Sequence, residues 1–164
     1  MQLIKLFFIS ACIMFSAIAV ADDAAPLNVS TEYYFVGVLG IFDAEGRLLA
    51  WEGPTSGDIE GVIRWWMEIP FEVRGQVTHF ANARWEILDE TGTFLILEGY
   101  EAGTTTNRPN KTGVWRANGI VTYVNPDYLD VETWFGRRIH DGGEFEWVIP
   151  GELPDWGWGN FRVN

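Results

Sequence analysis

The stretch "GVWRANGIVTYV", residues 113–124, predicts a strand that forms one wall of an enclosed space. Side chains alternate along a strand, so one face carries Trp115, Ala117, Gly119, Val121 and Tyr123. A solid core usually has Val, Ile and Leu along such a face, whereas the middle of this face has only the small residues Ala117 and Gly119, so the wall is thin there. A wall of this kind indicates that another chain segment, or a ligand, comes close to the backbone.

Similar alternating segments recur along the chain. "ARWEIL" places Ala83, Trp85 and Ile87 on one face, and "IEGVIRWWMEI" (59–69) divides into an apolar and a charged face. Turn signals separate such segments: "DAEG" (43–46), "GPTSGD" (53–58), "DETG" (89–92) and "DGG" (141–143). Helical periodicity is hard to find after residue 21, so the sequence predicts an all-β protein of roughly eight strands in meander order.

Short connections between successive strands favour closure into a barrel, because closure hides the strand edges. We therefore expect a single antiparallel eight-stranded β-barrel with a central apolar cavity, since such a barrel can hold one small ligand. Its first long strand is expected at 33–42, and the polar stretch 103–112 is expected to be its longest mobile loop. A two-sheet sandwich is the alternative.

The first 21 residues predict a secretory signal peptide cleaved after Ala21. They combine an early cation, Lys5, with a short apolar run and small residues before "DDAAP". A secreted or periplasmic protein is expected, with no transmembrane segment after cleavage. The expected parts of the chain are a signal peptide (1–21), an N-terminal extension (22–32) and the β-barrel domain (33–164).

Charge and cysteine content exclude several classes of function. Removal of Lys5 leaves 10 of the 11 Lys and Arg residues against 23 Asp and Glu, a formal net charge of −13. That charge repels phosphate backbones, so no nucleic-acid partner is expected. The single cysteine, Cys12, leaves with the signal peptide, which excludes thiolate metal sites. No cofactor and no metal site are predicted.

Three segments share their glycine, aromatic and turn positions with a known group of barrels: "TGTFLILEGYEAGT" (91–104), "GVWRANGIVTYV", and "WFGRRIHDGGEF" (134–145). In these features residues 91–145 resemble the allene oxide cyclases, dirigent proteins and related bacterial secreted proteins. The resemblance implies a calycin-like antiparallel barrel around an apolar cavity, in a group whose members guide cyclisation or coupling of hydrophobic molecules. No catalytic residue of that group can be matched onto this chain.

Three residues are candidates for catalysis. Glu98 shares a predicted strand face with Ile96 and Tyr100, and desolvation beside such side chains raises a carboxyl pKa towards neutrality. Tyr100 points into the same space because it lies two residues further along the strand. His79 ends an apolar face and is a candidate base, with a structural or rim position as the alternative.

The candidates for ligand binding are mainly aromatic: Trp65, Trp115, Tyr123, Trp134 and Arg138. On a strand, Arg138 would share a face with Trp134, and a buried arginine would seek a carboxylate or the acid group of a ligand. Solvated arginines at the rim of a hairpin are the alternative.

The function expected from the sequence is binding of a hydrophobic small molecule inside the barrel. An enzyme of the cyclase or isomerase type is one form of this hypothesis, because a barrel that holds a flexible substrate folded accelerates cyclisation. The alternative is a carbohydrate-binding β-sandwich module with exposed tryptophans such as those of "DWGWG" (155–159). An outer-membrane barrel is a third alternative, disfavoured by the charges on nearly every outward face.

Overall fold

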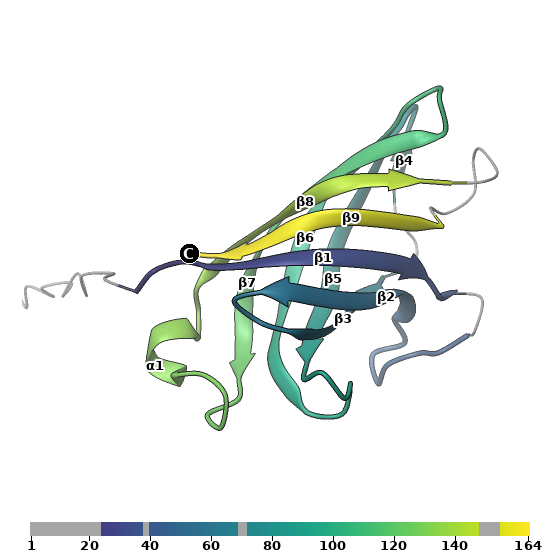
Figure 1. Ribbon diagram of the computed structural model, residues 1–164. Helices are drawn as coiled ribbons and strands as arrows, with labels where there is room; N and C mark the ends of the chain where they lie inside the picture. The colour runs from purple at the N-terminus through teal and green to yellow at the C-terminus, as the bar shows by residue number, and fades with distance from the viewer. Residues whose placement is uncertain (1–23, 38–39, 69–71, 148–154) are drawn as a thin grey trace, which may run out of the picture.

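The computed structural model describes residues 24–37, 40–68, 72–147 and 155–164 (Figure 1). The elements are β1 Leu27–Phe35, β2 Leu48–Gly57, β3 Gly61–Met67, β4 Glu72–Arg74, β5 Val77–Leu88, β6 Leu95–Asn107, β7 Thr112–Val124, α1 Val131–Trp134, β8 Arg138–Glu146 and β9 Trp156–Val163. The predicted signal peptide lies outside the described residues.

The strands form a closed antiparallel barrel. Neighbours in the sheet follow the order β3-β2-β1-β9-β8-β7-β6-β5, and β3 pairs with β5 to close the ring. The short strand β4 lies outside this ring of eight strands and pairs with residues 77–79 of β5, whereas β3 pairs with residues 84–88. The prediction of an eight-stranded meander barrel is therefore confirmed, and the sandwich alternative is wrong, because each of the eight strands other than β4 pairs with a neighbour on both sides.

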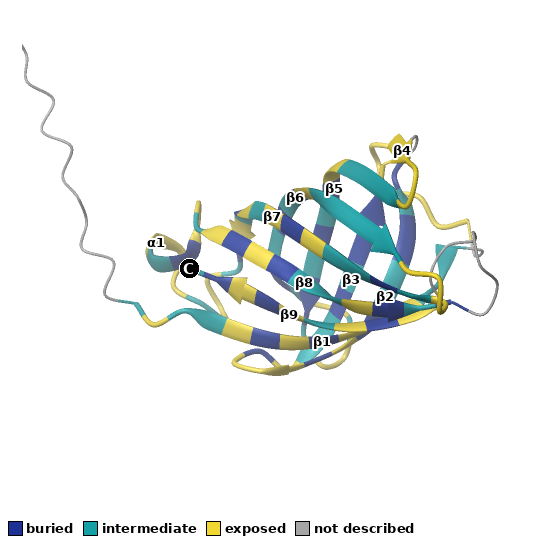
Figure 2. Cartoon of the chain, turned by 90° about the horizontal axis from the view of Figure 1, so that it is seen from above, coloured by how far each residue is buried: buried dark blue, intermediate teal, exposed yellow. Residues whose placement is uncertain are grey.

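Alternation along each strand divides the residues between the interior and the surface, as the blue and yellow bands of Figure 2 show. Ile63, Trp85 and Ile87 face inward as predicted, and each is completely buried. The rings of Trp85 on β5 and Phe161 on β9 lie 4.6 Å apart, although these strands stand on opposite sides of the ring. One layer of the barrel is thus a packed aromatic core.

The first strand differs from its predicted position. It runs from Leu27 to Phe35 and places Val29, Thr31 and Tyr33 inward, so the barrel begins before residue 33. Beyond Phe35 the described chain turns back along β2, where Leu49 N donates to Ile41 O at 2.8 Å. Residues 33–35 thus belong to β1, whereas Ile41 lies beside β2, so the predicted strand 33–42 is not one continuous element.

Three expected loops or turns are strand. Residues 53–57 continue β2, 103–107 continue β6, and "DGG" (141–143) lies inside β8. Residues 103–107 pair on both sides, with β5 and with β7. Polar and glycine-rich composition was the turn signal, but within this barrel wall the glycines make close contacts with large rings and backbone, and polar residues such as Asp141 and Thr55 are buried.

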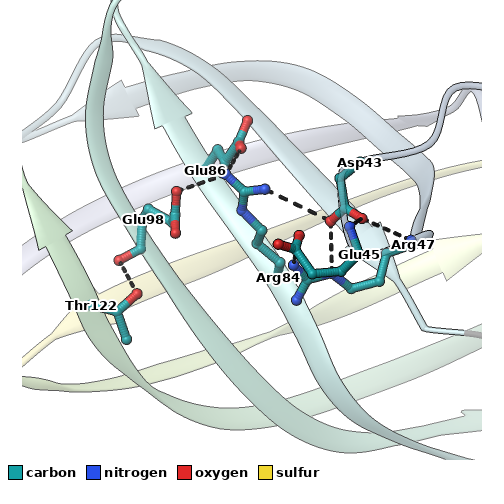
Figure 3. Close-up of polar contacts among 7 residues, drawn as sticks. All are labelled: Asp43, Glu45, Arg47, Arg84, Glu86, Glu98 and Thr122. Carbon is teal, nitrogen blue, oxygen red and sulfur yellow. Dashed lines mark hydrogen bonds and ion pairs between the residues drawn. The ribbon is translucent and has the colours of Figure 1, made fainter.

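A polar cluster covers part of the outer surface (Figure 3). The Arg84 guanidinium lies 2.5 Å from Glu86, 2.7 Å from Glu98 and 3.7 Å from Asp43. Asp43 also lies 2.7 Å from the Arg47 Nε atom, so the turn at 43–47 docks onto β5 through charges. Burial favours a higher pKa of Asp43, but hydrogen bonds and charge from Arg47 hold it below its usual value.

Candidate functional site

Two carboxylates face the interior on strands that flank β7. Glu101 on β6 is 3% exposed and Asp141 on β8 is 6% exposed. Glu101 lies opposite Gly119, and Asp141 lies opposite Ala117. The thin part of β7 noted in the sequence therefore separates the two carboxylates, and its small residues leave room for them.

Each carboxylate is held by one tryptophan. Trp65 on β3 donates its indole N–H to Glu101 Oε1, and Trp115 donates its own to Asp141 Oδ2 at 3.1 Å. The second oxygen of each carboxylate, Glu101 Oε2 and Asp141 Oδ1, is buried without a hydrogen-bond partner among the described residues. The two oxygens thus lack a well-aligned partner in the interior, although the Gly142 backbone N–H is close enough to lower the pKa of Asp141.

Tyr33 on β1 is the third polar group of the cluster. Its ring stands edge-on to Trp115, with the ring centroids 5.6 Å apart. The side chain is 6% exposed, and its hydroxyl makes no well-aligned hydrogen bond within the described residues, although Thr31 is close enough to influence it. Three inward polar groups therefore meet inside a mainly apolar barrel, which also buries the hydroxyl-bearing side chains of Thr31 and Thr55.

The three groups perturb one another. Burial raises the pKa of Asp141 to about 7, and the hydrogen bond from Trp115 opposes that rise. Burial and the charge of Asp141 raise the pKa of Glu101 well above its usual value. Burial and both carboxylates also raise the pKa of Tyr33, against a lowering by Thr31. Burial thus opposes ionisation of both carboxyl groups, and the charge of Asp141 further opposes ionisation of Glu101.

Glycines shape the wall beside Trp115. A Cβ atom at Gly143 would lie 2.5 Å from the Trp115 ring, and one at Gly159 would lie 2.6 Å from it. The indole therefore rests directly on the backbone of β8 and β9. Gly143 was predicted to lie in a turn, whereas its role, like that of Gly159, is to admit a large ring.

Aromatic rings surround the interior cluster of Tyr33, Glu101 and Asp141. Trp51 and Phe80 each lie 5.2 Å from Trp65, measured between ring centroids. On the other side Phe145 stacks against Trp115 at 6.5 Å. The aromatic layer of Trp85 and Phe161 lies next to the carboxylates, because Phe161 on β9 is the cross-strand partner of Asp141. The cluster therefore has few polar neighbours, which explains the strength of the desolvation.

The structure brings together two of the predicted ligand-binding residues, Trp65 and Trp115. Trp134 is buried in α1 at one end of the barrel, away from a strand face. Tyr123 is 40% exposed and points outward, because an extra residue in β7 opposite Glu98 and Gly99 shifts the alternation. Such a β-bulge gives no clear signal in the sequence.

The expectation that Glu98 and Tyr100 point inward is wrong. Gly99, between them, faces the Trp85 ring, so both neighbours lie on the outer surface. Glu98 pairs there with Arg84, and the Arg47 guanidinium lies 5.0 Å from the centre of the Tyr100 ring. The inward carboxylate of this strand is Glu101, because the odd-numbered residues of β6 face inward there, whereas the prediction chose the even-numbered ones.

The remaining candidates lie outside the interior cluster of Tyr33, Glu101 and Asp141. Arg138 is exposed on β8, because the short helix α1 and the turn at Gly136 replace the predicted strand and shift its phase. Its neighbour His140 is also exposed, and the Nδ1 atom lies 2.5 Å from Asn118 Oδ1. His79 is half-buried beside Phe80 on β5, and Phe80 is the residue that reaches Trp65.

Sequence reasoning missed Tyr33, Glu101 and Asp141. Asp141 was hidden by the turn-like "DGG", and Glu101 by the choice of strand phase. The available signal was the glycines: Gly99, Gly103 and Gly119 mark inward positions, and Glu101 shares their phase. Among the described residues, no group of three or more His, Cys, Asp or Glu could hold a metal ion.

A second feature lies on the outer wall. Trp156 and Trp158 on β9 are 40% and 38% exposed, with ring centroids 4.7 Å apart. Tyr34 on β1 is paired with Trp156 and is 49% exposed. Glu32 and Glu144 flank Trp158 on the neighbouring strands. We refer to Tyr34, Trp156 and Trp158 as the outer aromatic patch.

Comparison with known proteins yields one short similarity. A segment of 39 residues is 54% identical to part of an adenylosuccinate synthetase from Carboxydothermus hydrogenoformans. It covers 24% of this chain and only 9% of the synthetase, which is too short to place the barrel in a family. No family model matches the chain, and no solved structure matches it. In the described part of the chain, no helix has the length and apolar character needed to cross a membrane.

Proposed function

We propose that this protein binds a hydrophobic small molecule inside its barrel. The observation that carries the proposal is the cluster of Tyr33, Glu101 and Asp141, whose free oxygens face an aromatic interior. Ligand sites typically combine apolar walls with a few placed polar groups. Each buried polar atom without a partner costs about 1–3 kcal/mol, so a ligand that supplies partners recovers that energy.

An enzyme of the cyclase or isomerase type is the catalytic form of this proposal. Burial raises the pKa of Asp141 to about 7, so this carboxyl can give and accept a proton near neutral pH, and burial raises the pKa of Glu101 in the same direction. Glu101 and Asp141 therefore replace Glu98, Tyr100 and His79 as the candidate acid and base. The resemblance to allene oxide cyclases and dirigent proteins supports the same form.

Binding is tested by native mass spectrometry of the purified protein and by quenching of tryptophan fluorescence. We expect a co-purifying small molecule, and quenching by polyaromatic compounds or fatty-chain compounds but not by polysaccharides. The Trp115→Phe variant should lose most of the quenching, whereas Trp156→Phe, on the outer wall, should keep it. Absence of both a co-purifying molecule and any quenching would overturn the proposal.

Carbohydrate binding is a second candidate, favoured by the outer aromatic patch. Exposed rings on a rigid strand can stack on sugar rings, and Glu32 and Glu144 offer acceptors for sugar hydroxyl groups. Retention on an insoluble glycan that is lost in Trp158→Ala but kept in Trp115→Phe would support it. Equal retention of both variants would remove the patch from consideration.

The location of the protein follows from its predicted signal peptide. We include secretion, or export to a periplasm, in the proposal. Edman sequencing of the exported protein should begin at Asp22. Recovery of the protein with residues 1–21 attached, inside the cell, would contradict it.

A further inference from the structure

The free polar atoms of the interior restrict the chemistry of a ligand. Glu101 Oε2 and Asp141 Oδ1 are both carboxylate oxygens, on strands either side of β7. The ion pairs among the described residues join Arg and other carboxylates, and they include neither of these two. An acidic ligand would be repelled by whichever carboxyl is ionised, and a group that only accepts hydrogen bonds could pair with a protonated carboxyl but not with an ionised one.

A hydrogen-bond donor with a positive charge fits both oxygens. A primary ammonium has three N–H donors, so it can bond to Glu101 and to Asp141 at the same time. Tyr33 is an independent indication of a ligand, because its hydroxyl is buried, lacks a well-aligned partner and lies near both carboxylates. The Tyr33 oxygen can accept the third N–H.

The aromatic rings around Glu101 and Asp141 also favour an ammonium group. Trp65 and Trp115 already hold the carboxylates through their indole N–H groups. Trp51, Phe80 and Phe145 pack around these two indoles. Aromatic faces attract cations, most strongly where water is excluded. An apolar body attached to the ammonium would lie against these rings.

We propose that the interior ligand carries a protonated amine, and that this amine binds between Glu101 and Asp141 with its apolar part against Trp65 and Trp115. This inference rests on the proposed function of ligand binding inside the barrel. It names the class of ligand: an aromatic or hydrophobic primary amine.

Proton release accompanies such binding. Without a cation nearby, burial keeps the carboxyl pair partly protonated at neutral pH. An ammonium favours the ionised forms of both groups, so binding expels a proton from the pair. Amine affinity should therefore rise between pH 6 and pH 8, whereas the affinity for an uncharged analogue should not.

The test uses three probes with one apolar skeleton: 2-(1-naphthyl)ethylamine, 2-(1-naphthyl)ethanol and 1-naphthylacetate. Affinities are measured by isothermal titration calorimetry on the full protein at pH 6 and pH 8. Two buffers with different ionisation enthalpies report the number of protons released. We expect the amine to bind at least about tenfold more tightly than the alcohol at pH 8, the acetate to bind weakest, and proton release at pH 6.

Matched variants locate the amine. Glu101→Gln and Asp141→Asn keep the size of each side chain and remove its charge, so each should abolish the preference for amine over alcohol. Glu98→Gln, on the outer surface, should keep it. Circular dichroism and thermal unfolding confirm that each variant is folded at the temperature of the titration.

The outcomes separate the two proposals. Equal binding of alcohol and amine, with both weakened by Trp115→Phe, would overturn the amine inference and leave interior binding intact. Failure of all three probes, together with a native mass spectrum free of small molecules, would overturn both. A crystal soaked in the amine that shows only water between Glu101 and Asp141 would also overturn the inference.

Discussion

Glu101 on β6 lies directly opposite Gly119 on β7, and the missing side chain of the glycine makes space for the carboxylate. A Cβ atom at Gly119 would lie 2.8 Å from Glu101 Cβ and 2.9 Å from Glu101 Cα, closer than carbon atoms pack. It would also collide with the backbone carbonyl of Tyr100. Gly119 is thus a requirement of the site, although it carries no functional group.

Replacement of Gly119 by alanine should destabilise the barrel. The methyl group meets backbone atoms that cannot rotate away, so we expect a loss of about 1–3 kcal/mol in the free energy of unfolding. Urea unfolding measures it. Gly142→Ala is the matched control, because its nearest neighbour, the Trp115 carbonyl oxygen, would be 3.2 Å away. Equal stability of the two variants would contradict the account of the thin wall.

Stability should fall as the pH rises from about 4 to about 7. Burial raises the pKa of Asp141 from 3.8 to about 7, so the folded state keeps a proton that the unfolded chain loses above about pH 4. The folded state therefore loses relative stability until the pH passes 7, by at most on the order of 4 kcal/mol. Urea midpoints from pH 4 to pH 8 measure the slope.

Asp141→Asn should flatten that slope, because asparagine does not titrate. Asp127 is exposed in the turn before α1, so Asp127→Asn is the control and should keep the slope of the wild type. Part of the slope comes from Glu101, whose pKa is raised in the same direction by burial and by Asp141. If Asp141→Asn and Asp127→Asn gave identical slopes, Asp141 would have an ordinary pKa.

Arg84→Met should destabilise the protein by about 2 kcal/mol, between the values for an exposed and a buried ion pair. The change leaves Asp43, Glu86 and Glu98 close together without the shared guanidinium. Arg74→Met is the control, since Arg74 and its partner Glu72 are 67% and 59% exposed; it should cost less than about 0.5 kcal/mol. Equal losses would show that the Arg84 cluster is no stronger than a surface pair.

Residues 103–107 should exchange their amide hydrogens slowly. They were expected to be a mobile loop, but they pair with β5 on one side and β7 on the other. Hydrogen–deuterium exchange followed by mass spectrometry should show protection close to that of 95–102 in the same strand. The turn at 108–111 is the internal reference and should exchange faster than 103–107, although Arg108 N donates to Thr112 O at 2.8 Å and Pro109 has no amide hydrogen.

The fold was predictable because its signals are local. Alternation in "ARWEIL" and in residues 61–67 assigned the correct inward residues, and short connections indicated a closed meander. Irregular positions were not predictable in the same way. A bulge in β7 turns Tyr123 outward, and α1 interrupts what had the pattern of a strand. Each depends on contacts with residues distant in the sequence.

The site was less predictable because both phases of β6 contain apolar residues and a carboxylate. Phe94, Ile96, Glu98 and Tyr100 make one face, and Leu95, Leu97, Gly99 and Glu101 make the other. Only the register decides between them, and it places Gly99 against Trp85. Asp141 depended on the same kind of information, since its partner Trp115 is 26 residues away.

The pairing of β1 with β9 has a consequence for how the chain folds. Every other pair of neighbours around the ring is close in sequence, whereas Leu27 pairs with Val163 at the two ends of the described barrel. Local hairpins can form as the chain is made, but the ring cannot close before β9 exists, and joining such distant segments is entropically costly and slow. Until then the chain exposes two unpaired strand edges. The residues after 155 therefore act as a latch, and a chain released before they are complete is an open sheet prone to aggregation.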